Sequence, residues 1–135
     1  MASEKSPSKL QLFISYSHSD ADWARSFAQA LSKRGFAVWL DQFRVRAGEP
    51  LRDALESGLR NSDVFVTLID AEHPSRPNLF FELGAAIGMG KKIVAIVPKE
   101  FPATELPAEL RLRRYLTRDS PEETAQELSA SLTAA

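Results

Sequence analysis

The segment VFVTLI, residues 64–69, decides the fold class of this chain, because every position is β-branched or apolar. Continuous runs of this kind are typical of strands that a parallel sheet buries on both faces, whereas half-exposed strands alternate apolar and polar residues. The segment KIVAIV, residues 92–97, has the same pattern and is followed by Pro98. The two segments therefore predict neighbouring strands of a parallel sheet that has helices on both faces.

The sequence on both sides of these strands alternates further strand patterns with helical patterns. Apolar runs of strand length occupy residues 10–14 and 36–40, and residues 115–116 predict a short edge strand. Apolar residues recur at helical spacing over residues 21–34, 51–59, 78–90 and 121–132. This order predicts a flavodoxin-like three-layer sandwich, an α/β fold with five parallel strands in the order 2-1-3-4-5. We expect residues 1–9, which are polar and Ser-rich, to be a disordered lead, and residues 10–135 to form one domain.

The composition excludes several classes of function. The 135 residues include no cysteine, which excludes disulfide scaffolds, cysteine zinc sites, iron–sulfur clusters and thiol nucleophiles. The net charge of −1 is unlike that of a protein that binds nucleic acid through phosphate contacts. The apolar runs are shorter than the roughly 20 residues of a membrane helix, and the N-terminus has no apolar signal region. We therefore expect a cytoplasmic domain that binds neither membrane nor nucleic acid.

The predicted topology places a ligand crevice beyond the carboxyl ends of the first and third strands, where the winding of the sheet reverses. The loops that reach this crevice, residues 15–20 and 70–77, are polar and contain the two histidines, His18 and His73. These histidines have no metal-ligand spacing, so we predict no metal site. No GxGxxG motif follows the first strand, and the Walker-like segment 84–91 precedes a strand instead of following one.

Glu82 is the most informative residue of the helix predicted at 78–90. The apolar residues that define the buried stripe of this helix are Leu79, Phe80, Leu83, Ala86 and Ile87. At about 100° per residue, Glu82 lies at the edge of the stripe, partly desolvated and directed along the rim of the crevice. Such a carboxylate is either a functional acid or a first-turn residue favoured by the helix dipole, and the pattern leaves both interpretations open.

Four segments match, in order, the sequence boxes of a known family. They are FISYSHSD at 13–20, VWLD at 38–41 with the loop to Gly48, DVFVTL at 63–68 and NLFFELGAA at 78–86. These segments resemble the first box, the second strand and BB loop, the third strand and the helix-C box of the Toll/interleukin-1 receptor (TIR) domains. The resemblance covers residues 10 to about 132 and implies a flavodoxin-like fold, in agreement with the hydrophobic pattern.

The resemblance implies one of two functions. Many bacterial and plant TIR domains cleave NAD+ at the nicotinamide glycosidic bond, often in anti-phage defence, whereas others only assemble signalling complexes. In the enzymes a glutamate of the third helix is catalytic, and it corresponds to Glu82. The positions expected to contact the dinucleotide are Ser15, Tyr16, Ser17, His18, Arg46 and Asn78. The chain departs from the family at Asn78, where Trp is frequent, and at Arg46, where some enzymes have an acid.

A single carboxylate is compatible with NAD+ cleavage. Nicotinamide leaves as a neutral pyridine from a cationic one, so it needs no proton, unlike the alkoxide leaving group of a glycoside. One carboxylate can stabilise the ribosyl cation and hold the ribose hydroxyls. NAD+ is then the substrate, and no cofactor is expected. A third interpretation is a nucleoside deoxyribosyltransferase-like enzyme, which shares the sheet and a helix glutamate.

Two segments are candidates for self-association. The tip of the segment that resembles the BB loop is basic and partly apolar, and consists of Arg44, Val45 and Arg46. It is either a solvated loop or, as the resemblance implies, a contact to a neighbouring domain or to the ligand. Phe81 is predicted on the outer face of its helix, which Ala85 and Met89 continue, and a large exposed aromatic favours an interface. We also expect a fused or associated sensor domain in a longer protein.

Overall fold

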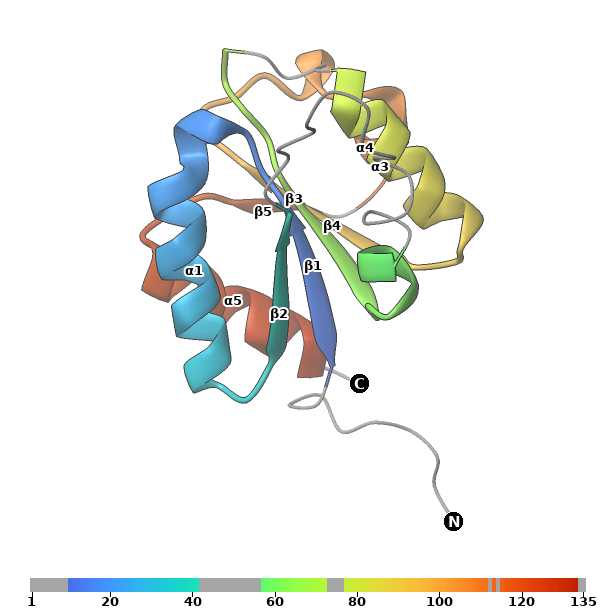
Figure 1. Cartoon of the computed structure of the whole chain (residues 1–135). Coiled ribbons are helices and arrows are strands. Elements are labelled where there is room, and N and C mark those ends of the chain that lie inside the picture. The colour runs from blue at the N-terminus through green and yellow to red at the C-terminus, as the bar shows by residue number, and fades with distance from the viewer. Residues whose placement is uncertain (1–9, 42–56, 73–76, 112, 114, 134–135) are drawn as a thin grey trace.

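A sheet of five parallel strands forms the centre of the computed structural model, which describes residues 10–41, 57–72, 77–111, 113 and 115–133 (Figure 1). The strands are β1 (Gln11–Ser15), β2 (Ala37–Asp41), β3 (Val64–Leu68), β4 (Lys92–Val97) and β5 (Tyr115–Thr117). They pair in the order β2-β1-β3-β4-β5, and every pair is parallel. The predicted flavodoxin-like fold and its strand order are confirmed.

Helices cover both faces of the sheet and divide the core in two. The helices α1 (Ala21–Lys33) and α5 (Pro121–Thr133) lie side by side on one face, and α3 (Pro77–Gly88) and α4 (Ala108–Arg111) cover the other (Figure 1). Two single-turn 3-10 helices, η2 (His18–Asp20) and η3 (Ala103–Glu105), precede α1 and α4. Because successive strand residues face opposite sides, Leu12 and Ile14 pack towards α1 and α5, whereas Phe13 packs towards α3.

The face that α3 buries differs from the predicted stripe. Leu83 and Ala86 are buried as predicted, but Ile87, predicted to be buried, is 40% exposed. Ala85 and Met89, predicted on the outer face, are half-buried and pack against the core. The cause is the composition of the helix, in which Glu82 is the single charged residue. With so little polar contrast, the apolar pattern does not fix which face turns inward.

Parts of the sequence prediction fall on residues outside the described ranges. These are the lead at 1–9, all but the first residue of the loop expected at 41–49, the first six residues of the helix expected at 51–59, and residues 73–76 of the loop at 70–77, which include His73. Residues 57–60 are helical. Within the described part of the chain, no helix has both the length and the apolar character needed to cross a membrane.

Gly58 allows a close approach between the helical residues 57–60 and the sheet. A Cβ atom at this position would lie 2.8 Å from Cε2 of Trp39 and 2.9 Å from Cε2 of Phe13. Phe13 is fully buried and stacks on Phe65 with ring centroids 5.8 Å apart, so it has little room to move. Packing therefore requires glycine at position 58.

We expect Gly58→Ala to lower the free energy of unfolding by about 1–3 kcal/mol, because the added methyl group overpacks Phe13. Gly84→Ala on α3 is the matched control, since a Cβ atom there would have no described neighbour within 4 Å. The control should raise the free energy of unfolding by about 0.5–1 kcal/mol, because alanine is the better helix former. Urea denaturation measures both free energies of unfolding. If Gly58→Ala and Gly84→Ala change this free energy in the same direction, the close packing described at Gly58 is contradicted.

Candidate active site

Three polar residues are buried where β1 and β3 end. Ser15 on β1 and Thr67 on β3 are register partners in adjacent strands, and Glu82 lies on α3, which covers this face of the sheet. All three residues are 0% exposed. The Ser15 hydroxyl donates a hydrogen bond to Glu82 Oε1, with an oxygen–oxygen distance of 2.8 Å. The third helix therefore directs its one carboxylate onto the end of the first strand.

The complete burial of Glu82 corrects the prediction that it lies partly desolvated on the rim of the crevice. The rotation of α3 about its axis turns Glu82 inward together with Leu83 and Ala86. An ionised carboxylate is costly to bury, and a hydroxyl donor at 2.8 Å offsets part of that cost. In a site that excludes water, a carboxylate also attracts a nearby positive charge more strongly than it does in water.

The residues that follow Ser15 are placed very differently from one another. Tyr16 is 8% exposed and packs in the core beneath α1 and α5, and its contact with the dinucleotide stays a prediction. Ser17 is half-buried, and its Oγ lies 3.0 Å from Ser19 Oγ and 3.3 Å from Asp20 Oδ2. His18 is exposed. Of the four residues predicted to contact the dinucleotide at positions 15–18, Ser17 and His18 are therefore the more accessible.

The remaining predicted site residues cannot be placed relative to Glu82. Arg44, Val45 and Arg46 lie outside the described residues. Asn78 and Phe81 belong to α3, but their side chains also lie outside the description. Their roles stay predictions.

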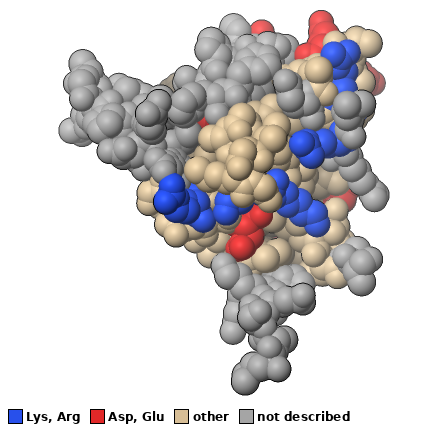
Figure 2. Space-filling view, turned by 90° about the vertical axis from the view of Figure 1, so that its right-hand side faces the viewer, with Lys and Arg blue, Asp and Glu red and all other residues tan. Residues whose placement is uncertain are grey.

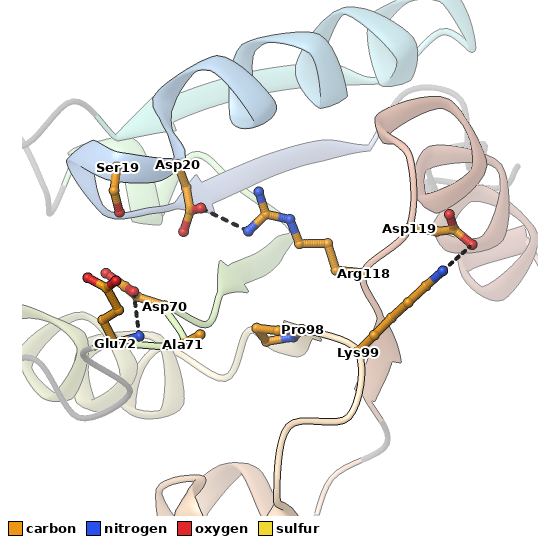
Figure 3. A pocket seen from close by; sticks show the side chains of 9 residues that line it. All are labelled: Ser19, Asp20, Asp70, Ala71, Glu72, Pro98, Lys99, Arg118 and Asp119. Atoms are coloured by element: carbon orange, nitrogen blue, oxygen red, sulfur yellow. Dashed lines mark hydrogen bonds and ion pairs between the residues drawn. The ribbon is translucent and has the colours of Figure 1, made fainter.

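A pocket of about 530 Å³ opens at the same edge of the sheet (Figure 3). The residues that line it follow the ends of four strands: Ser19, Asp20, Asp70, Ala71, Glu72, Pro98, Lys99, Arg118 and Asp119. The predicted convergence of the loops after β1 and β3 is thus confirmed. Glu82 is not among these lining residues, so the pocket and the buried carboxylate are separate features.

Arg118 fastens the end of β5 to the loop after β1. Its Nη1 lies 2.8 Å from Asp20 Oδ1 (Figure 3), and its guanidinium carbon lies 4.5 Å from the centre of the Trp23 ring. The Trp23 indole N–H donates to the backbone carbonyl of Asp119 at 3.1 Å. Sequence reasoning missed Arg118, because no local spacing indicates a partner 98 residues away.

The second ion pair at the pocket, between Lys99 and Asp119, is exposed. The backbone N–H of Ser120 donates to Asp119 Oδ1 at 2.8 Å, and this bond is the main cause that lowers the pKa of Asp119 below its usual value. The charge of Lys99, whose Nζ lies 3.6 Å from Asp119 Oδ2, acts in the same direction. The exposure of the Lys99–Asp119 pair means that it contributes little to stability.

The polar side chains of the site do not form a metal centre. Across the described ranges, no three His, Cys, Asp or Glu side chains come together in a way that could hold a metal ion. The described residues at the carboxyl edge provide a buried carboxylate, hydroxyl groups and the ion pairs of the pocket.

The fold and site define a doubly wound, parallel α/β domain with a buried helix carboxylate at the carboxyl edge of its sheet. The family model described as the TIR domain matches residues 12–131, and the chain belongs to this family. It is 32% identical over 77 residues to the 2′ cyclic ADP-D-ribose synthase AbTIR of Acinetobacter baumannii, covering 56% of this chain and 29% of that protein. It is 36% identical over 52 residues to the NAD(+) hydrolase TcpA of Theionarchaea archaeon, covering 38% of this chain and 16% of that protein. The chain thus spans less than a third of the length of these curated relatives.

A solved structure agrees with the family. The TIR domain of the Toll-related receptor TRR-2 from Hydra magnipapillata superposes with a TM-score of 0.67 at 17% sequence identity, covering 91% of this chain and 98% of that chain. At this identity the likeness shows the fold alone.

We expect Arg118→Met to lower the free energy of unfolding by about 1–2 kcal/mol, because it leaves the partly buried Asp20 carboxylate without its cation. Lys99→Met removes the cation of the exposed pair in the same pocket and should cost less than about 0.5 kcal/mol. Urea denaturation of the two variants distinguishes them. Equal losses, or a loss with Lys99→Met alone, would contradict the role assigned to Arg118.

Proposed function

We propose that this chain cleaves the bond between nicotinamide and ribose in NAD+, with Glu82 as the catalytic residue. The observation that carries the proposal is the Glu82 carboxylate, fully buried at the carboxyl ends of β1 and β3 and bonded to the Ser15 hydroxyl. Ligands of open parallel sheets bind in the crevice at this point of the topology. The names of two relatives, an NAD(+) hydrolase and a 2′ cyclic ADP-D-ribose synthase, support this chemistry.

The proposed reaction needs one carboxylate. The bond between ribose C1′ and the pyridinium nitrogen breaks heterolytically, and its electron pair neutralises the nitrogen as nicotinamide leaves. The ribosyl cation that forms is stabilised by the negative charge of Glu82, an interaction strengthened by the exclusion of water. A water molecule, or a hydroxyl of the same ADP-ribose, then attacks C1′ and loses its proton to solvent. The first course gives linear ADP-ribose, and the second gives a cyclic product.

The other residues support this carboxylate in the proposal. Ser15 was predicted to contact the dinucleotide, but because it is 0% exposed it is proposed instead to position Glu82 through the hydrogen bond at 2.8 Å. Ser17 and His18 contact the dinucleotide from the loop after β1, since both are accessible there. Arg46 and Asn78 contribute further contacts, an assignment that rests on their family positions alone. The substrate is NAD+, and no cofactor takes part.

The biological setting is a further part of the proposal. We infer a cytoplasmic effector of bacterial anti-phage defence that a fused or associated sensor domain activates. The bacterial source of the A. baumannii relative supports the bacterial setting, and the defence role and the sensor domain rest on the resemblance to the family alone.

A non-catalytic interaction module is the alternative, and the burial of Glu82 favours the enzyme over it. A module without catalysis has no need for an acid that the fold must desolvate, and an apolar residue on α3 would be less costly. A deoxyribosyltransferase-like enzyme would use the same acid on a different substrate. Incubation with NAD+ and, separately, with a deoxynucleoside distinguishes the three functions by which substrate releases its base.

We expect Glu82→Gln to reduce NAD+ cleavage at least about a thousandfold, because it removes the charge that stabilises the ribosyl cation. Glutamine keeps the size of the side chain and an oxygen that can accept from Ser15, so the thermal unfolding midpoint should change little. Glu127→Gln, an exposed acid on α5, is the matched control and should retain full turnover. Nicotinamide release, followed by chromatography, measures all three proteins. Turnover near that of the wild type in Glu82→Gln would contradict the assignment.

We also propose that activity requires self-association, through Arg44, Val45 and Arg46 and through the outer face of α3, with Phe81. On that face Gly84, Ile87 and Gly88 are exposed. Figure 2 shows uncharged surface bordered by Lys and Arg on the side of the molecule where α3 lies. An exposed Ile87 without charged neighbours on its helix favours an apolar contact.

Specific activity should therefore rise with protein concentration over a hundredfold dilution series, because association follows mass action. Ile87→Asp and Phe81→Asp should suppress this rise, since either places a charge in the contact. Ala130→Asp, on the exposed side of α5, is the control and should leave the rise intact. Constant specific activity, together with a monomer throughout in sedimentation, would rule out activation by assembly.

A further inference from the structure

Thr67 has a buried hydroxyl group that makes no hydrogen bond to the residues that the structure describes. The residue is 0% exposed, and its Oγ1 has no hydrogen-bond partner among the residues that the structure describes. A buried hydroxyl that loses its bonds to water and gains none in return destabilises the folded chain. Valine has nearly the same shape and avoids this cost. The hydroxyl at position 67 therefore calls for an explanation other than stability.

The place of Thr67 in the sheet suggests what the hydroxyl is for. Thr67 is the register partner of Ser15 on the adjacent strand, so the two side chains share a face of the sheet. That face is the one covered by α3, because Phe65, two residues before Thr67, packs in the same core as Leu83. Two hydroxyls thus lie side by side at the end of the crevice, and Ser15 is the one bonded to Glu82.

Glu82 must move if it is to act on a substrate. Its side chain is 0% exposed in the arrangement held by Ser15, so a ribose cannot touch the carboxylate there. The ligand crevice of this topology lies between β1 and β3. A carboxylate that turns from Ser15 towards the crevice approaches β3, where Thr67 is the neighbouring hydroxyl donor. With a donor at its destination, the charge avoids the cost of an unsatisfied carboxylate at the moment of reaction.

We propose that Thr67 is a positioning residue for Glu82, and that its hydroxyl donates to the Glu82 carboxylate when NAD+ is bound. Ser15 holds the carboxylate in the resting arrangement, and Thr67 holds it in the reacting one. This inference rests on the proposed function of Glu82. It explains why β3 carries a threonine at a position where valine would pack with less cost.

Thr67→Val tests the proposal, because stability and catalysis should change in opposite directions. We expect the thermal unfolding midpoint to rise by roughly 2–6 °C, since the substitution removes an unsatisfied hydroxyl. We expect kcat for NAD+ to fall about tenfold or more, with KM nearly unchanged, because a hydrogen bond to a charged group is lost in the reacting state. Thr67→Ser restores the hydroxyl and should recover most of kcat.

Thr124 offers a matched control on α5. It is also 0% exposed, but its Oγ1 accepts a hydrogen bond from the backbone N–H of Asp119 at 2.9 Å. Thr124→Val should therefore lower the unfolding midpoint and leave kcat unchanged once the protein is folded. The unfolding midpoint should therefore rise in Thr67→Val and fall in Thr124→Val, and kcat should fall in Thr67→Val alone.

The outcomes separate this inference from the proposed function. If the wild type cleaves NAD+, Glu82→Gln does not and Thr67→Val retains full kcat, the role of Thr67 is overturned and the proposed function stands. A lower unfolding midpoint in Thr67→Val also overturns it, because the hydroxyl would then have a stabilising partner in the resting state. If the wild type releases no nicotinamide at any protein concentration, the proposed function fails and the role of Thr67 fails with it.

Discussion

The hydrogen bond from the Ser15 hydroxyl to Glu82 Oε1 joins the first strand to the third helix inside the core, and the rest of the site is arranged around it. It forms because the parallel order of the sheet brings the ends of β1 and β3 together and returns α3 across them. A carboxylate in this position is expensive for a domain of this size, whose net stability is on the order of 5–15 kcal/mol. Its presence at the carboxyl edge, where open parallel sheets bind ligands, is most simply explained by a chemical role towards a bound ligand.

The two faces of the sheet carry different kinds of polar residue at this edge. On the α3 face, Ser15, Thr67 and Glu82 are buried in an otherwise apolar core. On the α1 and α5 face, the ion pair between Asp20 and Arg118, covered by Trp23, fastens the loop after β1 to the end of β5. That loop also carries Ser17 and His18, the more accessible of the residues predicted to contact the dinucleotide there. In the proposed function, the α1 and α5 face supports the loop that contacts the substrate, while the α3 face supplies the charge.

The sequence predicted the fold because its strongest signal, the β-branched run at 64–69, is set by burial on both faces of a sheet and needs no distant partner. It also singled out Glu82 as a candidate, but did not predict its burial, since the apolar composition of α3 leaves the rotation of the helix undetermined. Thr67 could not be singled out, because threonine is common in strands. Whether its hydroxyl has a hydrogen-bond partner can be seen in the structure but not in the sequence. The role of Arg118 was not predicted for a related reason, because its contact with Asp20 joins positions that are 98 residues apart in the sequence.

The most direct measurement of the central claim is a crystal structure of the chain with a non-hydrolysable analogue of NAD+. The claim that Glu82 acts on the nicotinamide ribose predicts that its carboxylate has left Ser15 and lies within hydrogen-bond distance of that ribose. An analogue bound elsewhere, for example in the pocket lined by Lys99 and Arg118, with Glu82 still buried against Ser15, would contradict it.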